Sequence, residues 1–344
     1  MLTPLESGFA MPAEWETHEA VWLAWPYDRD SFPNLEGAEN AFSRFVAEVS
    51  EDERVELLVT DELMEGKAKR LLEQNAANLE AVNFHILKYA DIWFRDYGPI
   101  FVVNREHKKL AMTKWIFNAW GNKYKELLPD NEIPYAMNKL LKLPQFETGM
   151  VLEGGSIEVN GKGTLLTTRQ CLLNPNRNPA LSKSNIENTL RDYLGATNII
   201  WLKSGIEGDD TDGHIDDIAR FVSPSTVLCA YQDDKSDPDY QALRENLEIL
   251  NSATDQDGRK LEVIRLPVPG RVGPPEKRLP ASYANFYIGN SKVLVPTFSV
   301  KNDERAIEVI RSAFPGRKVV GINAYFLAFG CGTFHCMSQQ QPAV

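Results

Sequence analysis

The sequence predicts an α/β fold built from five similar ββαβ units. Pairs of short apolar runs joined by a tight turn recur along the chain, and each pair is followed by an amphipathic stretch and one more apolar run. This order returns about every 60 residues, which is typical of a pseudo-symmetric chain made of repeated supersecondary units. We therefore expect residues 1–344 to form one domain. An ordinary α+β fold with short strands is the alternative, because the units share an order of elements and no sequence motif.

The third unit shows the pattern most clearly. Asn160-Gly161 separates two apolar runs and is a strong signal for a two-residue hairpin. An amphipathic helix is predicted over Ser184–Leu194, with Ser184 and Glu187 as a capping box and Gly195 as the residue that ends it. A strand after the helix completes the unit.

The remaining units follow from the same order of elements. In chain order, the predicted elements are strand Val21–Trp25, helix Ala38–Val49 and strand Val55–Val59; strands Ile100–Val103 and Leu110–Trp115 and helix Pro134–Leu141; strands Ser156–Val159 and Thr164–Thr167, helix Ser184–Leu194 and strand Ile199–Leu202; strands Ile218–Val222 and Val227–Tyr231, helix Tyr240–Leu250 and strand Leu261–Leu266; and strands Asn285–Ile288 and Val293–Pro296, helix Asp303–Phe314 and strand Val319–Ile322.

The composition is typical of a water-soluble globular protein, with 43% hydrophobic residues and a net charge of −11. No run approaches the roughly 18 apolar residues of a membrane span, and Met1–Glu14 lacks the basic flank and apolar core of a signal peptide. We therefore expect a cytoplasmic protein that does not bind membranes. The negative charge argues against nucleic acid and suits a cationic substrate, although solubility alone also explains it. Homo-oligomerisation is left open.

The four cysteines have no disulfide spacing, so free thiols are expected in a reducing compartment. Cys229 lies in an apolar run and is interpreted as a buried small hydrophobe. Cys171 is also expected to be structural.

Polar residues stand just before the predicted hairpins. Asp96, Glu153, His214 and Asp216 each precede the first strand of a unit. If the units surround an axis, these leading loops meet at one end of it. Cys336 would have to return to the same place through the glycine-flanked segment that begins at Gly330.

This set of residues suggests chemistry on a positively charged group. A thiolate is a good nucleophile and a nearby imidazole can transfer protons, while two carboxylates can bind a planar cation through paired, charge-assisted hydrogen bonds. A guanidinium substrate fits this surplus of carboxylates better than a neutral amide does.

Each residue also has a simpler explanation. Asp96 before Gly98-Pro99 and Glu153 before Gly154-Gly155 are suitable turn residues. His335 is expected to be a packing or turn residue, and Gln339-Gln340-Gln341 a polar tail. The pair His214 and Asp216, with neighbouring aspartates, also resembles a metal-ligand fragment. Those neighbours are Asp209, Asp210, Asp212 and Asp217.

Several segments resemble the agmatine deiminases, from near one end of the chain to the other and in the same order. They are Met11–Glu16 with Ala24-Trp25-Pro26, Trp93–Pro99, Leu152–Ile157, Leu172–Pro179, Gly208–Asp217, Leu279–Phe286 and His335–Pro342. This family, also labelled the bacterial peptidyl-arginine deiminase type, belongs to the guanidino-modifying pentein group. The resemblance implies a five-unit ββαβ propeller with the active site on its central axis.

The resemblance also implies roles for individual residues. Cys336 would be the nucleophile and His214 the general acid and base, while Asp96 and Asp216 would hold the guanidinium. Glu153 would be a further carboxylate beside His214 and the substrate. For the distal amine and methylene chain of agmatine, the family positions match Asp210 and Trp93, and Asp212 is a second choice for the amine.

Two departures from the family pattern affect the expected choice of substrate. The usual Gly-Gly-Gly-Asn reads Gly330-Cys331-Gly332-Thr333 here, with Phe334 in place of an isoleucine, and the usual Asp-Thr-Asn-Gly-His has Asp212 in place of asparagine. Neither removes a catalytic group.

The implied reaction is hydrolysis of agmatine to N-carbamoylputrescine and ammonia, a step of putrescine biosynthesis, through an amidino-cysteine. No metal or cofactor is expected. Peptidyl-arginine and free arginine are the alternative substrates, although no cation can be assigned to a substrate carboxylate. A metal-dependent hydrolase and a non-catalytic guanidinium-binding module are the alternatives outside this chemistry. Whether His214 or the substrate activates the thiolate is left open.

Overall fold

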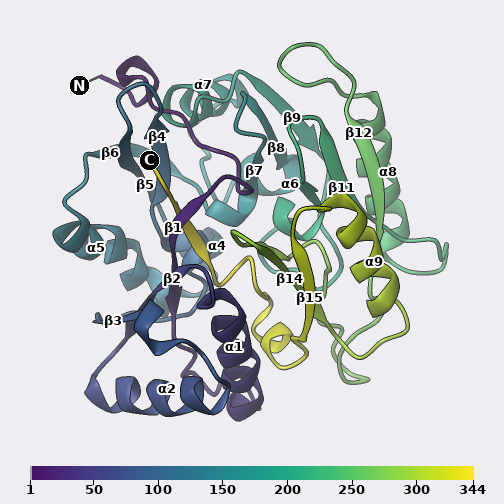
Figure 1. Cartoon of the computed structure of the whole chain (residues 1–344). Coiled ribbons are helices and arrows are strands. Elements are labelled where there is room, and N and C mark those ends of the chain that lie inside the picture. The colour runs from purple at the N-terminus through teal and green to yellow at the C-terminus, as the bar shows by residue number, and fades with distance from the viewer. Residues whose placement is uncertain (1) are drawn as a thin grey trace.

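The computed structural model describes residues 2–344 and contains five separate β-sheets (Figure 1). In four of them an antiparallel hairpin is followed by a helix and by a third strand that runs parallel to the second. The helix is the crossover connection that two parallel neighbouring strands need. These four units are β4 (Ile100–Asn104), β5 (Lys109–Ile116), α5 (Ile133–Leu141) and β6 (Gln145–Val151); β7 (Ile157–Val159), β8 (Thr164–Thr168), α7 (Lys183–Leu194) and β9 (Asn198–Leu202); β10 (Ala219–Phe221), β11 (Thr226–Tyr231), α8 (Asp239–Ser252) and β12 (Glu262–Pro267); and β13 (Tyr287–Ile288), β14 (Lys292–Thr297), α9 (Asp303–Ala313) and β15 (Lys318–Asn323).

The fifth sheet has four strands and joins the two ends of the chain. Its order is β16-β1-β2-β3, and two helices connect its parallel strands. The elements are β1 (His18–Ala24), α1 (Leu35–Val49), β2 (Arg54–Val59), α2 (Glu62–Gln74), β3 (Val82–Ile86) and β16 (Gln339–Pro342). The sequence did not predict α2 and β3, which extend this unit beyond the expected second strand.

The interpretation of Gln339–Gln341 as a polar tail is wrong. These glutamines form most of β16, which pairs antiparallel with β1 so that Trp22 lies opposite Gln339. Trp22 Nε1 also donates a hydrogen bond of 2.9 Å to Gln341 Oε1. Backbone pairing stabilises a strand regardless of its polar side chains, so this strand has no hydrophobic signal in the sequence. In Figure 1 the yellow C-terminal strand runs beside the purple β1.

The capping box of α7 lies two residues before its predicted position. Ser182 caps the helix: its Oγ accepts from Asn185 N, and Asn185 Oδ1 accepts from Ser182 N at 3.1 Å. Glu187, the predicted partner, instead accepts a hydrogen bond from Trp201 Nε1 at 2.8 Å. Gly195 does end the helix, with the positive φ of +77° that glycine tolerates.

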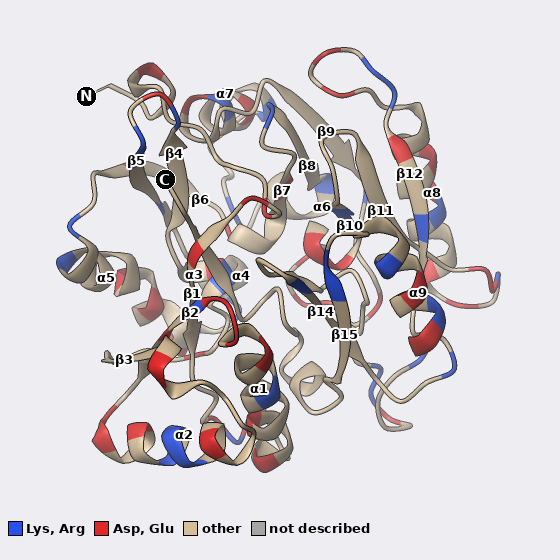
Figure 2. Ribbon diagram, in the orientation of Figure 1, with Lys and Arg blue, Asp and Glu red and all other residues tan. Residues whose placement is uncertain are grey.

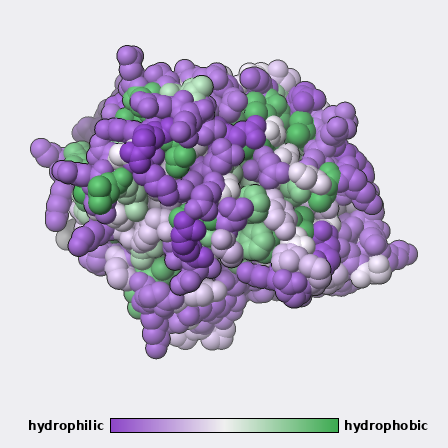
Figure 3. Space-filling view, turned by 90° about the horizontal axis from the view of Figure 1, so that it is seen from below, coloured by the Kyte–Doolittle hydropathy of each residue, from purple (hydrophilic) through white to green (hydrophobic). Residues whose placement is uncertain are grey.

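Three clusters of buried apolar side chains form the interior. The largest contains aromatic residues from α1, α3 (Phe94–Tyr97) and the segment before β16. Cys229 is fully buried, as the sequence predicted, Cys171 is fully buried as well, and the four cysteines are free thiols. The face in Figure 3 is mostly hydrophilic with small, separate apolar patches. None of the helices within residues 2–344 has the length and hydropathy of a membrane span.

Candidate active site

The predicted site residues come from short turns that lead into the hairpins. Asp96 lies in α3 before β4, and Glu153 lies directly before the 3-10 helix Gly154–Ser156 and β7. His214 and Asp216 lie at the 3-10 helix Ile215–Asp217 before β10. In Figure 2, acidic residues gather on the inner loops near β10, while outer helices such as α2 and α8 carry both charges.

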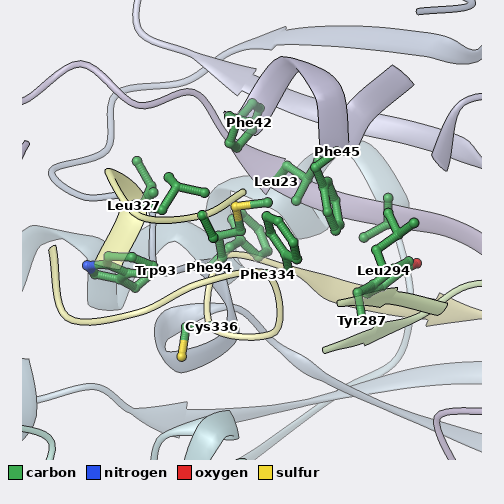
Figure 4. Close-up of a cluster of buried hydrophobic side chains, with 14 of the residues drawn as sticks. Leu23, Phe42, Phe45, Trp93, Phe94, Tyr287, Leu294, Leu327, Phe334 and Cys336 are labelled. Atoms are coloured by element: carbon green, nitrogen blue, oxygen red, sulfur yellow. The ribbon is translucent and has the colours of Figure 1, made fainter. Parts of the chain in front are cut away.

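Cys336 lies in the turn that directly precedes β16. Phe334 packs within the largest apolar cluster, and Figure 4 shows the Cys336 side chain pointing away from Phe334 and its neighbours. Cys336 Sγ lies 3.4 Å from Asp216 Oδ2 and accepts a hydrogen bond of 3.0 Å from Asn285 Nδ2. Burial and the charges of Asp216, Asp217 and Asp96 raise the pKa of the thiol well above its usual value. The surroundings of Cys336 therefore favour the neutral thiol.

The His214 imidazole lies fully buried between two carboxylates. Its Nδ1 is 3.7 Å from Asp96 Oδ1 and its Nε2 is 4.0 Å from Glu153 Oε2. Neither ring nitrogen has a hydrogen-bond partner among residues 2–344. Burial opposes protonation, but the carboxylate of Asp96, the neighbouring Cys171 thiol and Glu153 outweigh it and raise the pKa of His214 well above its usual value. The ring is therefore a cation, ready to donate a proton.

Asp96 is held in place by two donors. Trp120 Nε1 donates to Oδ2 at 2.9 Å, and the backbone N–H of Gly155 donates to Oδ1 at 3.0 Å. Burial raises the pKa of Asp96 to about 6 although the cationic His214 opposes the rise. A cation bound at this carboxylate would therefore also lower its pKa.

Glu153 lies behind His214 rather than in the cavity. It is fully buried, does not line the cavity described below, and accepts a hydrogen bond of 2.6 Å from Arg177 Nε. Arg177 binds this carboxylate and His214 lies beside it, so the place of Glu153 beside the substrate stays a prediction. Its position beside His214 agrees with the prediction.

A cavity of about 520 Å³ opens over Cys336 and Asp96. Among residues 2–344, its lining includes Trp93 and Asp210, both predicted, and six acidic side chains against one ammonium, that of Lys277. The acidic side chains are those of Asp28, Asp30, Asp91, Asp96, Glu126 and Asp210. A cavity with this excess of negative charge concentrates cations.

Two features of the cavity were not predicted. Asp210 Oδ2 accepts a hydrogen bond of 2.5 Å from the Tyr124 hydroxyl. Asp91 lies near Asp210, and burial with the neighbouring Asp130 carboxylate raises the pKa of Asp91 to about 8. The cavity wall therefore has a second acidic group besides the one around Cys336.

Asp212 does not line this cavity, and its predicted part in substrate binding stays a prediction. Its carboxylate pairs with Arg177 at 2.7 Å and with Lys123 at 2.9 Å. Its backbone has a φ of +67°, a conformation that asparagine and aspartate tolerate. The local requirement for this conformation explains why either residue suits the position.

Sequence reasoning missed three residues around the reacting groups. His335 lies between two carboxylates, with Nδ1 2.7 Å from Asp216 Oδ2 and Nε2 2.8 Å from Glu14 Oε1, so it orients Asp216 as well as filling space. Glu14 also binds Arg95 and Arg220 in a fully buried network. Asn285, which contacts Cys336, was interpreted only as part of a strand. Glu14 and Asn285 precede β1 and β13, the place in the unit that identified the other residues.

One group of side chains with metal-ligand spacing is a poor fit for a metal ion. Glu153, Cys171 and His214 have ligand atoms within 4.8 Å of one another. However, the guanidinium of Arg177 already pairs with Glu153 and its charge opposes a second cation. The donor set is therefore better suited to holding an imidazolium than a metal ion.

The family model for Porphyromonas-type peptidyl-arginine deiminases matches residues 10–342. This chain belongs to that family. An agmatine deiminase of Medicago truncatula is 40% identical over 377 residues, which cover 99% of this chain and 98% of the relative. The chain is therefore similar to its relatives over its whole length.

Solved structures show the same fold. An agmatine deiminase of Enterococcus faecalis superimposes with a TM-score of 0.92 and 33% identity, covering 100% of this chain and 98% of the other. An agmatine deiminase variant of C. jejuni with substrate bound has a TM-score of 0.87 and 33% identity, covering 97% and 96%. An amidinotransferase of Microseira wollei, at 13% identity and a TM-score of 0.53, shares the α/β fold alone.

Proposed function

We propose that this protein hydrolyses agmatine to N-carbamoylputrescine and ammonia through a covalent amidino-cysteine. The observation that carries the proposal is the acidic cavity over Cys336 and Asp96, which has a second acidic group at Asp210 and Asp91. A dication with a guanidinium at one end and an ammonium at the other matches both groups. The names of the relatives support the same substrate.

Substrate binding forms the nucleophile. Asp96 and Asp216 bind the guanidinium, which displaces the contact between the Cys336 thiol and Asp216. The added positive charge beside the sulfur lowers the pKa of the thiol, and the thiol proton leaves to solvent because His214 already carries one. Substrate-assisted activation therefore fits this geometry better than proton transfer to His214.

Two half-reactions then share one imidazole. The thiolate attacks the guanidinium carbon, and His214 donates a proton to the leaving nitrogen, which departs as ammonia. Water attacks the amidino-cysteine while His214 accepts a proton from it. Collapse of this adduct breaks the carbon–sulfur bond while the remaining hydroxyl proton passes to the departing sulfur, which releases the ureido product and the thiol.

Free arginine is the second candidate substrate. Lys277 lines the cavity and supplies the cation that a substrate carboxylate needs, although the sequence alone had not revealed one. The neighbouring carboxylate of Asp210 would repel that group, so it favours agmatine.

The fold is proposed to be a single catalytic domain, a five-unit propeller with this site on its axis. In support of this proposal, each of the five sheets is preceded by a turn that carries one or more of the polar residues described above. The residues are Glu14, Asp96, Glu153, His214, Asp216 and Asn285.

The decisive experiment is a substrate profile. Formation of ureido product is measured with agmatine, arginine and arginine-containing peptides at equal concentrations, with wild type and Lys277→Ala. We expect agmatine to have the highest kcat/KM in both proteins. A preference for arginine that Lys277→Ala abolishes would establish the second candidate, and a preference for peptides would reject both.

A further inference from the structure

The sulfur of Cys336 lies among groups that oppose its ionisation. Asp216 Oδ2 is 3.4 Å away, and ligand atoms of Asp216, Asp217 and Cys336 lie within 4.8 Å of one another. Asp96 adds a further negative charge to the surroundings of the thiol. A thiolate formed here therefore needs a hydrogen-bond donor that remains in place throughout the reaction.

Asn285 is that donor. Its Nδ2 lies 3.0 Å from Cys336 Sγ. Its Oδ1 accepts hydrogen bonds from the backbone N–H of His335 at 3.1 Å, from that of Cys336 at 3.3 Å and from the Thr333 hydroxyl at 2.8 Å.

The orientation of this amide is fixed by its partners. A backbone N–H can only donate, so the side-chain oxygen must face the two backbone groups. The NH₂ group must then face the sulfur. Asn285 is 1% exposed, so water does not compete for these positions.

We propose that Asn285 is a catalytic residue of this site, donating a hydrogen bond to Cys336 Sγ both when the sulfur attacks and when it is expelled. The inference rests on the proposed function for its chemical step, because only a reacting thiolate gains from the bond. The competing explanation is that Asn285 only anchors the turn that carries Cys336. The two explanations differ in which half of the amide matters.

Alkylation by iodoacetamide tests the donor without any guanidinium substrate. The thiolate forms a carbon–sulfur bond and iodide leaves, so the rate against pH reports ionisation of Cys336. All proteins carry Cys331→Ser, because Cys331 is the other cysteine lining the cavity, and mass spectrometry confirms modification of Cys336. The charged groups that act on this titration are Asp96, Asp216 and Asp217.

Asn285→Ala and Asn285→Asp are compared with a control in the same turn. Aspartate keeps the oxygen that anchors the turn but lacks the donor, whereas alanine removes both without adding charge. Ser338→Ala removes a buried hydrogen bond of 2.7 Å to Phe334 O and does not touch the sulfur. Loss of the donor is therefore the one change that both Asn285 variants share.

We expect both Asn285 variants to be alkylated about ten- to a hundredfold more slowly than their parent at neutral pH. Their rates should converge with the parent at high pH, where the thiolate forms without help. Ser338→Ala should follow the parent throughout. An unchanged pH profile in folded Asn285→Ala, rescue by Asn285→Asp, or an equal loss in Ser338→Ala would overturn the proposal.

A measurement on the wild-type chain does not depend on the variants. The side-chain ¹⁵N resonance of Asn285 should shift with the same midpoint as alkylation of Cys336, and a signal that stays constant through that midpoint would overturn the proposal. Both readouts are independent of turnover. Failure of agmatine hydrolysis would therefore reject the proposed function while these results still decide whether Asn285 supports the thiolate.

Discussion

The thiol of Cys336 contacts a carboxylate, with Sγ 3.4 Å from Oδ2 of Asp216. The imidazole of His214 lies between Asp96 and Glu153, so its charge is balanced by other groups. The surroundings therefore favour a neutral thiol and a cationic imidazole, instead of the thiolate–imidazolium pair of many cysteine hydrolases. In the proposed mechanism, binding of a cation ionises the sulfur.

The covalent step predicts a modified Cys336. Quenching the enzyme during turnover of agmatine should leave an amidino adduct that intact-protein and peptide mass spectrometry assign to Cys336. Cys336→Ser should be folded and inactive, and Cys229→Ala, which removes a thiol buried in β11, should turn over normally. An adduct on Cys331 would refute the assignment of the nucleophile.

Substrate-assisted activation predicts release of a proton on binding. The surroundings of Cys336 favour the neutral thiol before substrate binds, and a bound guanidinium would lower the pKa of that thiol. Rapid mixing with agmatine at pH 7 should therefore release up to one proton per site before product forms. A pH-indicator dye in weak buffer measures this burst. The burst should disappear in Cys336→Ser, and its persistence there would assign the proton to another group.

Ionisation of Asp96 should limit activity in acid. Its pKa is about 6 in the free enzyme, so kcat/KM should fall as pH drops through about 6 and the guanidinium loses its carboxylate. Trp120→Phe removes the donor to Asp96 Oδ2 and should move this limb upward by about one to two pH units.

Trp115→Phe is the matched control for that variant. It removes an indole N–H bonded to Thr113 Oγ1, outside the cavity, and should leave the acid limb in place. A common shift in both variants would show that the effect comes from general loosening of the fold.

Asp210 and Asp212 should behave differently although they are two residues apart. Asp210 lines the cavity, so Asp210→Asn should raise KM for agmatine about ten- to a hundredfold with a smaller change in kcat. Asp212 faces Arg177 and Lys123 outside the cavity, and asparagine tolerates its backbone conformation, so Asp212→Asn should retain the wild-type KM. Steady-state kinetics measures KM in both variants, and an unchanged KM in Asp210→Asn would contradict this prediction.

Exhaustive chelation should leave activity unchanged. The proposed reaction uses a thiol, an imidazole and carboxylates, and Arg177 pairs with the carboxylate of the group Glu153, Cys171 and His214. Activity is measured after dialysis against chelator, with metal content checked by mass spectrometry. Loss of activity that a divalent ion restores would support the metal-dependent alternative.

The sequence predicted the repeated order of elements because each unit has its own local signals. Apolar runs marked most strands, and Asn160-Gly161 marked a hairpin between β7 and β8. The prediction failed where hydrogen bonding to a neighbouring strand, rather than burial of apolar side chains, stabilises a strand. The glutamines of β16 have no apolar pattern, and only their hydrogen bonds to β1 make them a strand.

The same division applies to the site. Residue types, their places before the hairpins and the resemblance to a family identified Cys336, His214, Asp96 and Asp216 as a group, and the structure brings these four together. Residues that work through a neighbour were missed, because nothing local distinguishes them. The roles of Asn285 and His335 can be recognised only in the folded structure, which places them against Cys336 and Asp216.

By itself, then, the sequence determined which chemistry the chain carries, since nucleophile, imidazole and carboxylates are properties of residue types. Only the tertiary structure decided which charges meet. It placed Asp210 in the cavity and Asp212 outside it, and it covered Glu153 with His214 and Arg177. Charge interactions in a buried site depend on distances of a few ångströms between residues far apart in the chain, and those distances are set by packing.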